Sequence, residues 1–242
     1  MGGFERYFKV KKLQRTITAS SIILLLSIPA YSADRVLSTG KWESIRLPVK
    51  SWIDIKNSNL IRQEYDYSCG SASVGTILKY FFNDDVSEQE VLDFILKKKG
   101  IDKSDKGKLE EKDTVLSFYD LKGFAEEKGY KSLGLALNLG TLKKLKVPAI
   151  VFVTIRKKEH FSVYKGMDER FVYLADPSFG NIKVTREKFE EMFYSREDKK
   201  QPGKILVFIP IDEKKNAQIN MDFMKIPESS DFVYRVIRNI HR

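Results

Sequence analysis

The chain has 242 residues, with 43 lysines and arginines against 33 aspartates and glutamates, and a formal net charge of +10. With 42% hydrophobic and 31% charged residues, it has an ordinary globular composition, which excludes a disordered or collagen-like chain. A single cysteine excludes an internal disulfide framework and a thiolate-rich zinc site, and two histidines argue against most histidine-based metal centres. We therefore expect one mid-sized domain, or one domain with small appendages, and no metal or cofactor.

The first 32 residues have the layout of a secretory signal peptide. Five basic residues within positions 6–15 precede an apolar stretch from Ile17 to Ile28, and the small residues of Ala30-Tyr31-Ser32 follow. The apolar stretch is shorter than the roughly 20 residues that a membrane-spanning helix needs. We therefore predict an exported, periplasmic protein. The alternative is an uncleaved segment that anchors the protein in the inner membrane, facing the periplasm.

The rest of the chain is expected to have three parts. Residues 33–59 read as an irregular N-terminal extension with Trp42 and Trp52 as packing anchors, residues 60–211 as the main domain, and residues 212–242 as a polar C-terminal tail. Short lysine runs are flanked by acidic residues and no nucleic-acid motif accompanies them. We therefore expect a solvated basic surface and no nucleic-acid partner.

Helical patterns dominate the first half of the main domain. They predict four helices, at Cys69–Phe82, from the capping box Ser87–Glu90, at about Thr114–Lys128 and at Asn138–Lys146. The polar loop between the second and third helices, from Asp102 to Asp113, has some likeness to a calcium-binding loop. Lys106 occupies a ligand position in it, so we reject a calcium site.

Beyond Pro148 the apolar pattern changes from helical to extended. Segments rich in Val, Ile, Phe and Tyr predict four strands, at Ala149–Ile155, His160–Gly166, Phe171–Ala175 and Ile205–Ile211. Short turns join the first three, so we expect them to be antiparallel neighbours. A helix is expected at Thr185–Phe193, and a short one in the tail at Asp231–Asn239. Helices first and antiparallel strands later indicate an α+β domain.

The single cysteine is the first candidate for chemistry. Cys69 opens the first predicted helix, where free backbone amides and the helix dipole favour a thiolate. The small residues Gly70 to Ser73 leave room for another chain to approach. The alternative is a buried small apolar residue, which is a common role for a free cysteine.

A thiolate nucleophile needs a base, and His160 is the plausible one. His241 is the penultimate residue of a polar tail, whereas His160 begins a predicted strand and can shuttle a proton to a leaving amine. Asp176 closes the next strand, and antiparallel pairing would bring its carboxylate to His160 as the group that orients the imidazole. The alternative for Asp176 is a plain Asp-Pro turn.

Gln63 is the candidate for stabilising an oxyanion. It lies six residues before Cys69, and its amide could donate to a developing oxyanion together with the backbone N–H of Cys69. An ordinary loop glutamine is the alternative.

Taken together, these segments resemble cysteine peptidase family thirty-nine, the bacteriocin-processing peptidases that cut after double-glycine leaders. The matching segments span roughly residues 60 to 210 and comprise Arg62 to Ser73, Leu78 to Phe81, Val86 to Glu88, Leu116 to Leu121, the strand after Pro148, His160-Phe161 and Asp176-Pro177. The resemblance implies a papain-like α+β fold, with a helical N-terminal half that carries the cysteine and a C-terminal antiparallel sheet that carries the histidine and the aspartate. It also implies the roles listed above: nucleophile, base, orienting carboxylate and oxyanion donor for Cys69, His160, Asp176 and Gln63.

The chain differs from the best-known members, which are domains of ABC exporters, because it has no Gly-rich phosphate loop. It is similar to stand-alone exported members that accompany secretion systems for functional amyloid. We expect a peptidase that cuts a co-secreted, unfolded protein or peptide after small residues such as Gly-Gly, with no cofactor. The alternative is a catalytically silent module that uses the same cleft to bind or escort a secreted chain.

Overall fold

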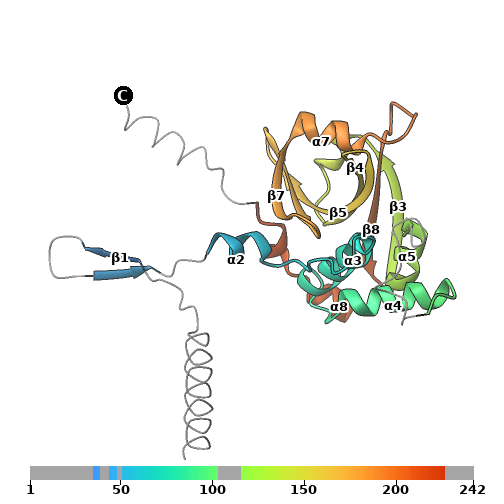
Figure 1. The fold of residues 1–242 in the computed structure, drawn as a ribbon, viewed down its shortest axis with the longest axis horizontal. Helices are drawn as coiled ribbons and strands as arrows, with labels where there is room; N and C mark the ends of the chain where they lie inside the picture. Colours follow the sequence, from blue (N-terminus) through green and yellow to red (C-terminus); the bar gives the residue numbers. More distant parts are fainter. Residues whose placement is uncertain (1–34, 39–43, 48–50, 103–115, 227–242) are drawn as a thin grey trace, which may run out of the picture. The chain divides into compact units, whose positions relative to one another are not determined.

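The computed structural model describes residues 35–38, 44–47, 51–102 and 116–226 (Figure 1). The chain divides into two units, residues 1–51 and residues 52–242. In the first unit, β1 (Arg35–Ser38) pairs antiparallel with β2 (Ser44–Leu47). The predicted signal peptide, Trp42, most of the predicted polar loop and the predicted tail helix lie outside the described residues.

A six-stranded antiparallel sheet is the frame of the second unit. Its strand order is β3-β8-β4-β5-β6-β7. The strands are β3 (Tyr130–Leu137), β4 (Ala149–Ile155), β5 (Lys158–Met167), β6 (Phe171–Asp176), β7 (Gly180–Thr185) and β8 (Gly203–Pro210). The predicted antiparallel pairing of β4 with β5 and of β5 with β6 is confirmed.

Two hydrophobic clusters pack on the sheet, because alternate residues of a strand point to opposite faces. Ile150 of β4 belongs to the cluster with α3 (Cys69–Tyr80), α4 (Glu88–Lys98) and α5 (Phe118–Glu127). Its neighbour Val151 belongs to the cluster with α6 (Leu139–Leu142) and α7 (Arg186–Phe193). The predicted α+β fold is confirmed, with a helical half that carries Cys69 and an antiparallel sheet that carries His160 and Asp176.

Capping residues mark the starts of α4 and α5, and α5 begins at Phe118, later in the chain than the predicted start at about Thr114. The Ser87 side chain accepts a hydrogen bond from the backbone N–H of Glu90, so α4 begins at the predicted cap. The α5 helix begins at a complete capping box formed by Ser117 and Asp120. It ends just before Gly129, whose φ of +83° lies in the left-handed region that glycine favours.

The segment before the main domain is more ordered than predicted. Residues Trp52–Asn57 form α2, which lies against β7, and the Asn181 side chain on β7 donates to backbone carbonyls of α2 and of Ser58. The interpretation of Trp52 as a packing anchor is wrong, because 70% of its surface is exposed on this short helix. Among the described helices, none is long and apolar enough to cross a lipid bilayer.

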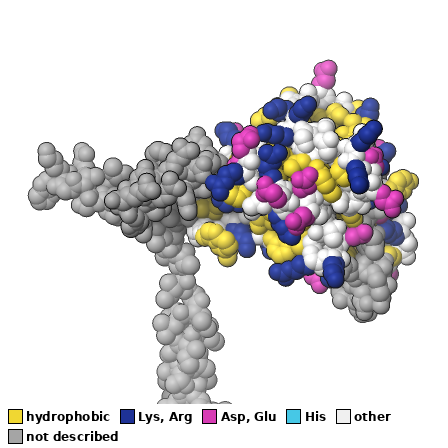
Figure 2. All heavy atoms as spheres, turned by 90° about the horizontal axis from the view of Figure 1, so that it is seen from above, with side chains coloured by type: hydrophobic (Ala, Val, Ile, Leu, Met, Phe, Trp, Pro, Cys, Tyr) yellow, Lys and Arg dark blue, Asp and Glu magenta, His cyan; other side chains and the backbone are white. Residues whose placement is uncertain are grey.

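The beginning of the predicted tail packs onto the main domain. It contains α8 (Glu213–Ala217) and the 3-10 helix η3 (Met221–Met224), whose Phe223 is buried in the cluster with α3. The Asn220 backbone N–H donates to the Phe81 carbonyl at 2.7 Å. On the face in Figure 2, lysines and arginines alternate with aspartates and glutamates, so no continuous patch of one charge forms there.

Candidate active site

Cys69 is the first residue of α3, the helix that packs against β5 where the helical half meets the sheet (Figure 1). Its side chain is a free thiol and is buried. The preceding residue, Ser68, does not cap the helix, because its hydroxyl bonds to the backbone of Tyr65 instead. The first-turn amides of α3 therefore have no side-chain cap, which suits a helix end that faces a thiolate or an oxyanion.

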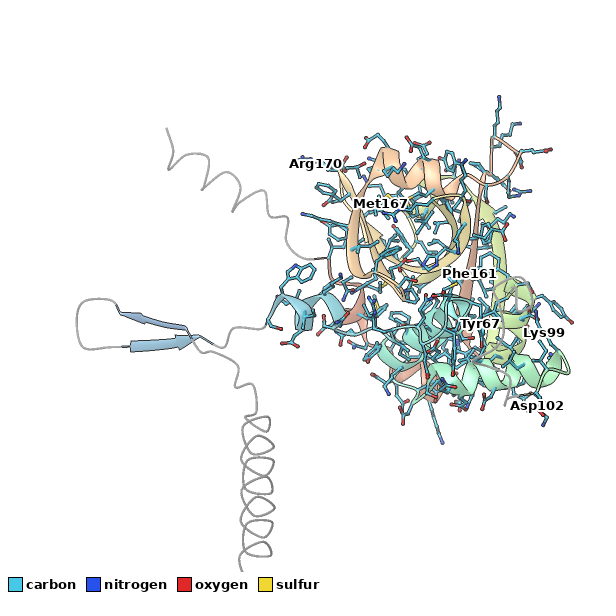
Figure 3. The ribbon with its side chains drawn as sticks, in the orientation of Figure 1. Tyr67, Lys99, Asp102, Phe161, Met167 and Arg170 are labelled. Atoms are coloured by element: carbon cyan, nitrogen blue, oxygen red, sulfur yellow. The ribbon has the colours of Figure 1, made fainter. Side chains whose placement is uncertain are left out.

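Small residues after Cys69 let α3 pack closely on β5. A Cβ atom added at Gly70 would lie 3.1 Å from ring carbon Cδ2 of Phe161 and 3.1 Å from methyl Cδ2 of Leu121. Phe161 lies in the interior of the domain (Figure 3), next to His160 in the chain. The space that the sequence analysis assigned to an approaching chain at Gly70 is therefore filled by these two side chains.

His160 and Asp176 meet across neighbouring strands. His160 lies on β5 and Asp176 ends β6, and the imidazole Nε2 is 2.9 Å from the carboxylate Oδ2. Only 11% of the His160 side chain is exposed and the Asp176 side chain is fully buried. The predicted proximity of these two residues is present in the structure.

Protonation of the pair follows from this geometry. Burial lowers the pKa of His160, but hydrogen bonds with Asp176 and Cys69 and their charges outweigh burial and raise it from 6.5 to about 10. Burial raises the pKa of Asp176, but the hydrogen bond with His160 and its charge outweigh that effect, so the pKa lies below its usual value. Since Nε2 is occupied by Asp176, Nδ1 is the ring nitrogen left for Cys69. The pair is therefore an imidazolium and a carboxylate near neutral pH.

The other carboxylate oxygen of Asp176 organises the turn that follows. Its Oδ1 accepts hydrogen bonds of 2.9 Å from the backbone N–H groups of Ser178 and Phe179. This turn places the Phe179 ring beside the imidazole, with 6.3 Å between the ring centroids. One buried carboxylate thus fixes both the histidine and the loop beside it.

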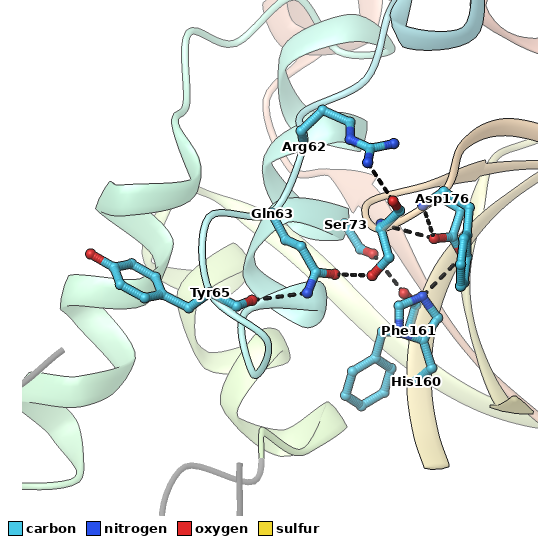
Figure 4. A network of polar contacts seen from close by, with 9 residues as sticks. Arg62, Gln63, Tyr65, Ser73, His160, Phe161 and Asp176 are labelled. Carbon is cyan, nitrogen blue, oxygen red and sulfur yellow. Dashed lines mark hydrogen bonds and ion pairs between the residues drawn. The ribbon is translucent and has the colours of Figure 1, made fainter. Parts of the chain in front are cut away.

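Gln63 belongs to the same polar network (Figure 4). Its backbone N–H donates to the Pro177 carbonyl at 3.2 Å, and its side-chain Oε1 accepts a hydrogen bond from the Ser178 hydroxyl. Its Nε2 donates to the Tyr65 carbonyl at 2.9 Å, which leaves the second N–H of the amide for another acceptor. The Arg62 guanidinium donates to the Ser178 carbonyl and closes the network.

The loop between α2 and α3, which carries Gln63, is held by α4. Both carboxylate oxygens of buried Glu88 accept from the backbone N–H of Glu64, at 3.0 and 3.2 Å. This contact fixes the backbone next to Gln63. Glu88 and Glu64 are 24 residues apart in the sequence, so no local pattern could have indicated their contact.

The structure thus brings three predicted residues, Cys69, His160 and Asp176, into one row. His160 is hydrogen-bonded to Asp176, and Cys69 lies close enough to the imidazole to raise its pKa. Ser178 connects Gln63 to that row. Such a row can activate a thiolate and donate a proton to a leaving group. Sequence reasoning missed Ser178, although the Asp-Pro-Ser turn signal marks a place where an aspartate bonds to the backbone two residues on.

The family model for the peptidase C39 family matches residues 57–196. The matched range begins six residues before Gln63 and ends beyond α7, so it contains every residue of the row.

Two relatives share the name "Probable functional amyloid protease FapD". The one from Pseudomonas fluorescens is 30% identical over 175 residues, which cover 69% of this chain and 72% of the relative. The one from Pseudomonas aeruginosa is 29% identical over 147 residues, which cover 58% of this chain and 59% of the relative.

Among solved structures, a double glycine motif protease from an AMS/PCAT transporter, in complex with the leader peptide, aligns with a TM-score of 0.47 and 25% identity. The alignment covers 62% of this chain and 90% of that protein.

Proposed function

This chain belongs to the peptidase C39 family, and on that premise we propose that its cysteine peptidase activity uses Cys69, His160 and Asp176 as catalytic residues. The observation that carries the proposal is that His160, hydrogen-bonded to buried Asp176, lies beside Cys69 at an uncapped helix start. The alternative, a cysteine that only fills space in the core, does not account for an imidazole beside the thiol that is itself bound to a buried carboxylate.

In the first half of the reaction, the Cys69 thiolate attacks the carbonyl carbon of the scissile peptide bond. The carbonyl π electrons move to oxygen, and the resulting oxyanion is stabilised by the backbone N–H of Cys69 and the free N–H of the Gln63 amide. The C–N bond then breaks as imidazolium His160 gives its proton to the leaving amine, which leaves a thioester on Cys69 and a neutral imidazole.

In the second half, neutral His160 takes a proton from a water molecule, whose oxygen attacks the thioester carbonyl. The C–S bond breaks, the carboxylic acid product leaves, and the thiolate–imidazolium pair is restored. Asp176 keeps its hydrogen bond to Nε2 throughout, so that Nδ1 stays directed at the reacting atoms.

For the substrate, we propose an unfolded segment of a secreted protein that is cut after small residues such as Gly-Gly. Two observations support this. The chain belongs to the peptidase C39 family, whose resemblance implies cleavage after such pairs. Two relatives carry the name "Probable functional amyloid protease FapD". A peptidase of this type binds its substrate as an extended chain, which a folded protein cannot offer. We therefore propose limited proteolysis of a co-secreted, amyloid-forming protein.

For the location, we propose the periplasm, with residues 1–32 removed as a signal peptide. N-terminal sequencing of the protein from its native host should give a start near Ala33 or Asp34. An intact Met1 in the membrane fraction would instead favour the anchored form.

Incubation of the purified protein with a peptide library, read by mass spectrometry, tests the proposed substrate. We expect cleavage after pairs of small residues by the wild-type protein and none by Cys69→Ala. A preference for a bulky residue before the scissile bond would refute the substrate proposal. Binding of peptides by the wild-type protein without any cleavage would support the silent escort function instead.

A further inference from the structure

Exposed apolar side chains gather on α2 more than on any other described helix. Trp52, Ile53 and Ile55 are 70%, 60% and 54% exposed, whereas no other described helix carries more than one exposed large apolar side chain. The Asn181 side chain on β7 donates to backbone carbonyls of α2, so this exposed group is held in place on the domain. Contiguous apolar surface of this kind marks a contact with a partner or a membrane.

A cavity of about 440 Å³ lies beside α2, over β5, β6 and β7. The helices α2 and η3 lie side by side in Figure 1, and both contribute to the lining. Ile55 belongs to this lining, together with Lys165 and Lys183 from the strands and Asp222 and Lys225 around η3. Three of its charged side chains are lysines and one is an aspartate, so the lining carries a net positive charge.

The ammonium group of Lys165 lacks a counter-charge within the described ranges. Lys165 is the extra residue of a β-bulge on β5, and its Nζ lies 4.8 Å from the centroid of the Phe223 ring. No aspartate or glutamate among the described residues forms an ion pair with it, and Asp222 pairs with Lys225 at 2.7 Å. Burial lowers the pKa of Lys165, because its charged form loses hydration there. A bound anion would supply the missing counter-charge.

The combination of an exposed tryptophan, aliphatic side chains and lysines fits the surface of a lipid bilayer. Tryptophan is enriched at membrane–water interfaces, and lysines are attracted to anionic headgroups. The Lys56 Nζ lies 4.8 Å from the centroid of the Trp52 ring, so a lysine accompanies the indole on the same helix. A second copy of this chain is a poorer occupant, because a two-fold contact would place the lysines of one lining against those of the other.

The two helices that form this surface flank the family match. The family model spans residues 57–196, whereas α2 ends at Asn57 and η3 begins at Met221. The exposed apolar helix and the η3 part of the cavity are therefore additions to the peptidase domain. Peptide hydrolysis at Cys69 does not by itself account for them.

We propose that α2 and the rim of this cavity form a surface that binds bilayers containing anionic phospholipid. Trp52 and Ile53 enter the headgroup region, as the apolar side chains of interfacial helices do. Lys165 and Lys183 bind the phosphate of a lipid headgroup that enters the cavity. This surface keeps the protein at a membrane without a spanning helix.

Co-sedimentation with lipid vesicles tests the proposal. The protein used is residues 33–242, which retain every described residue, because the apolar stretch within residues 1–32 would itself bind vesicles. We expect it to sediment with vesicles of phosphatidylglycerol and phosphatidylethanolamine, and to stay in solution with vesicles of phosphatidylcholine alone. Equal sedimentation with both compositions, or none with either, would overturn the proposal.

Two pairs of variants locate the contact. Ile53→Ser should weaken binding to the anionic vesicles about tenfold, because an aliphatic side chain no longer enters the bilayer. Its control is Ile211→Ser, which removes an exposed isoleucine outside this surface and should leave binding unchanged. Lys165→Met should weaken binding about fivefold, and its control is Lys131→Met, at an exposed position of β3. Equal effects within either pair would contradict the proposed surface.

Tryptophan fluorescence gives a second measurement on the same surface. The chain has two tryptophans, so Trp42→Phe leaves Trp52 as the reporter. We expect its emission maximum to move to shorter wavelength with phosphatidylglycerol vesicles and not with glycerol phosphate in solution. A shift with glycerol phosphate, without sedimentation with vesicles, would show a site for a small anion and overturn the membrane surface. Neither measurement involves peptide cleavage, so failure of this proposal leaves the peptidase proposal standing.

Discussion

At the scale of single residues, the site depends on one buried carboxylate with two tasks. Oδ2 of Asp176 bonds to His160, and Oδ1 bonds to the backbone of Ser178 and Phe179. The proposed base and the turn that contacts Gln63 therefore share an anchor, and a change at Asp176 should affect both.

The pH profile of Asp176→Asn tests the charge of that anchor. In the wild-type protein the pKa of His160 is about 10, so the alkaline limb of kcat/KM, where the imidazolium loses its proton, should lie well above pH 6.5. Asparagine still accepts a hydrogen bond but carries no charge, so the limb should move down by about one to three pH units. An unchanged alkaline limb in the variant would show that Asp176 does not hold the proton on His160.

Ser178→Ala tests the link between Ser178 and Gln63. Loss of the hydroxyl removes the hydrogen bond to Oε1 of Gln63, so that the amide is held only through Nε2 and the Tyr65 carbonyl. We expect kcat to fall about five- to tenfold with KM nearly unchanged, because only the oxyanion contact is weakened. The control is Ser195→Ala, an exposed serine after α7. A loss that appears in KM alone would contradict a positioning role.

At the scale of elements, the position of Cys69 depends on how closely α3 packs on β5. Gly70→Val would force methyl groups into the space held by Leu121 and Phe161, and should destabilise the fold by about 1–3 kcal/mol. Gly134→Val on β3 is the matched control, since nothing lies within 4 Å of a Cβ there and valine suits a strand. Thermal unfolding of both variants decides the matter, and a Gly70 variant as stable as the control would contradict the packing account.

Elements with strong local signals were predictable and those that depend on distant partners were not. β4 was predicted with its observed bounds, because Ala149–Ile155 is an apolar run after a proline. β3 was missed, because Gly134 and Lys131 weaken its pattern and its partner β8 lies about seventy residues later in the chain. α2 was missed for a similar reason, since its contact with β7 depends on Asn181.

The residues of the candidate site also fall into two groups, those that the sequence could identify and those whose contacts only the fold reveals. Cys69, His160, Asp176 and Gln63 could be named from residue type, position and family resemblance. The contacts that Ser178 makes with Gln63 and Glu88 makes with Glu64 could not be predicted, because they join residues 115 and 24 positions apart and only the folded chain brings them together.

At the scale of the whole molecule, the charged pair makes stability depend on pH. The raised pKa of His160 means that its contribution is complete below pH 6.5 and is lost as pH rises toward 10. The lowered pKa of Asp176 means that its contribution is present above pH 3.8 and is lost as pH falls through the lower folded value. Urea unfolding of the wild-type protein and of Asp176→Asn gives the difference between their free energies of unfolding. This difference should therefore be largest between pH 3.8 and pH 6.5 and should shrink above pH 6.5. An advantage that does not vary with pH would argue against a charged pair.

Peptide hydrolysis by matched histidine variants tests the central claim most directly. The chain has two histidines, His160 in the row and His241 outside the described residues. The His241→Ala variant is therefore the control for His160→Ala. The account predicts that His160→Ala lowers kcat by about a hundredfold to ten-thousandfold, that Cys69→Ala abolishes hydrolysis, and that His241→Ala cleaves at the wild-type rate. Wild-type rates in Cys69→Ala or His160→Ala would contradict the account.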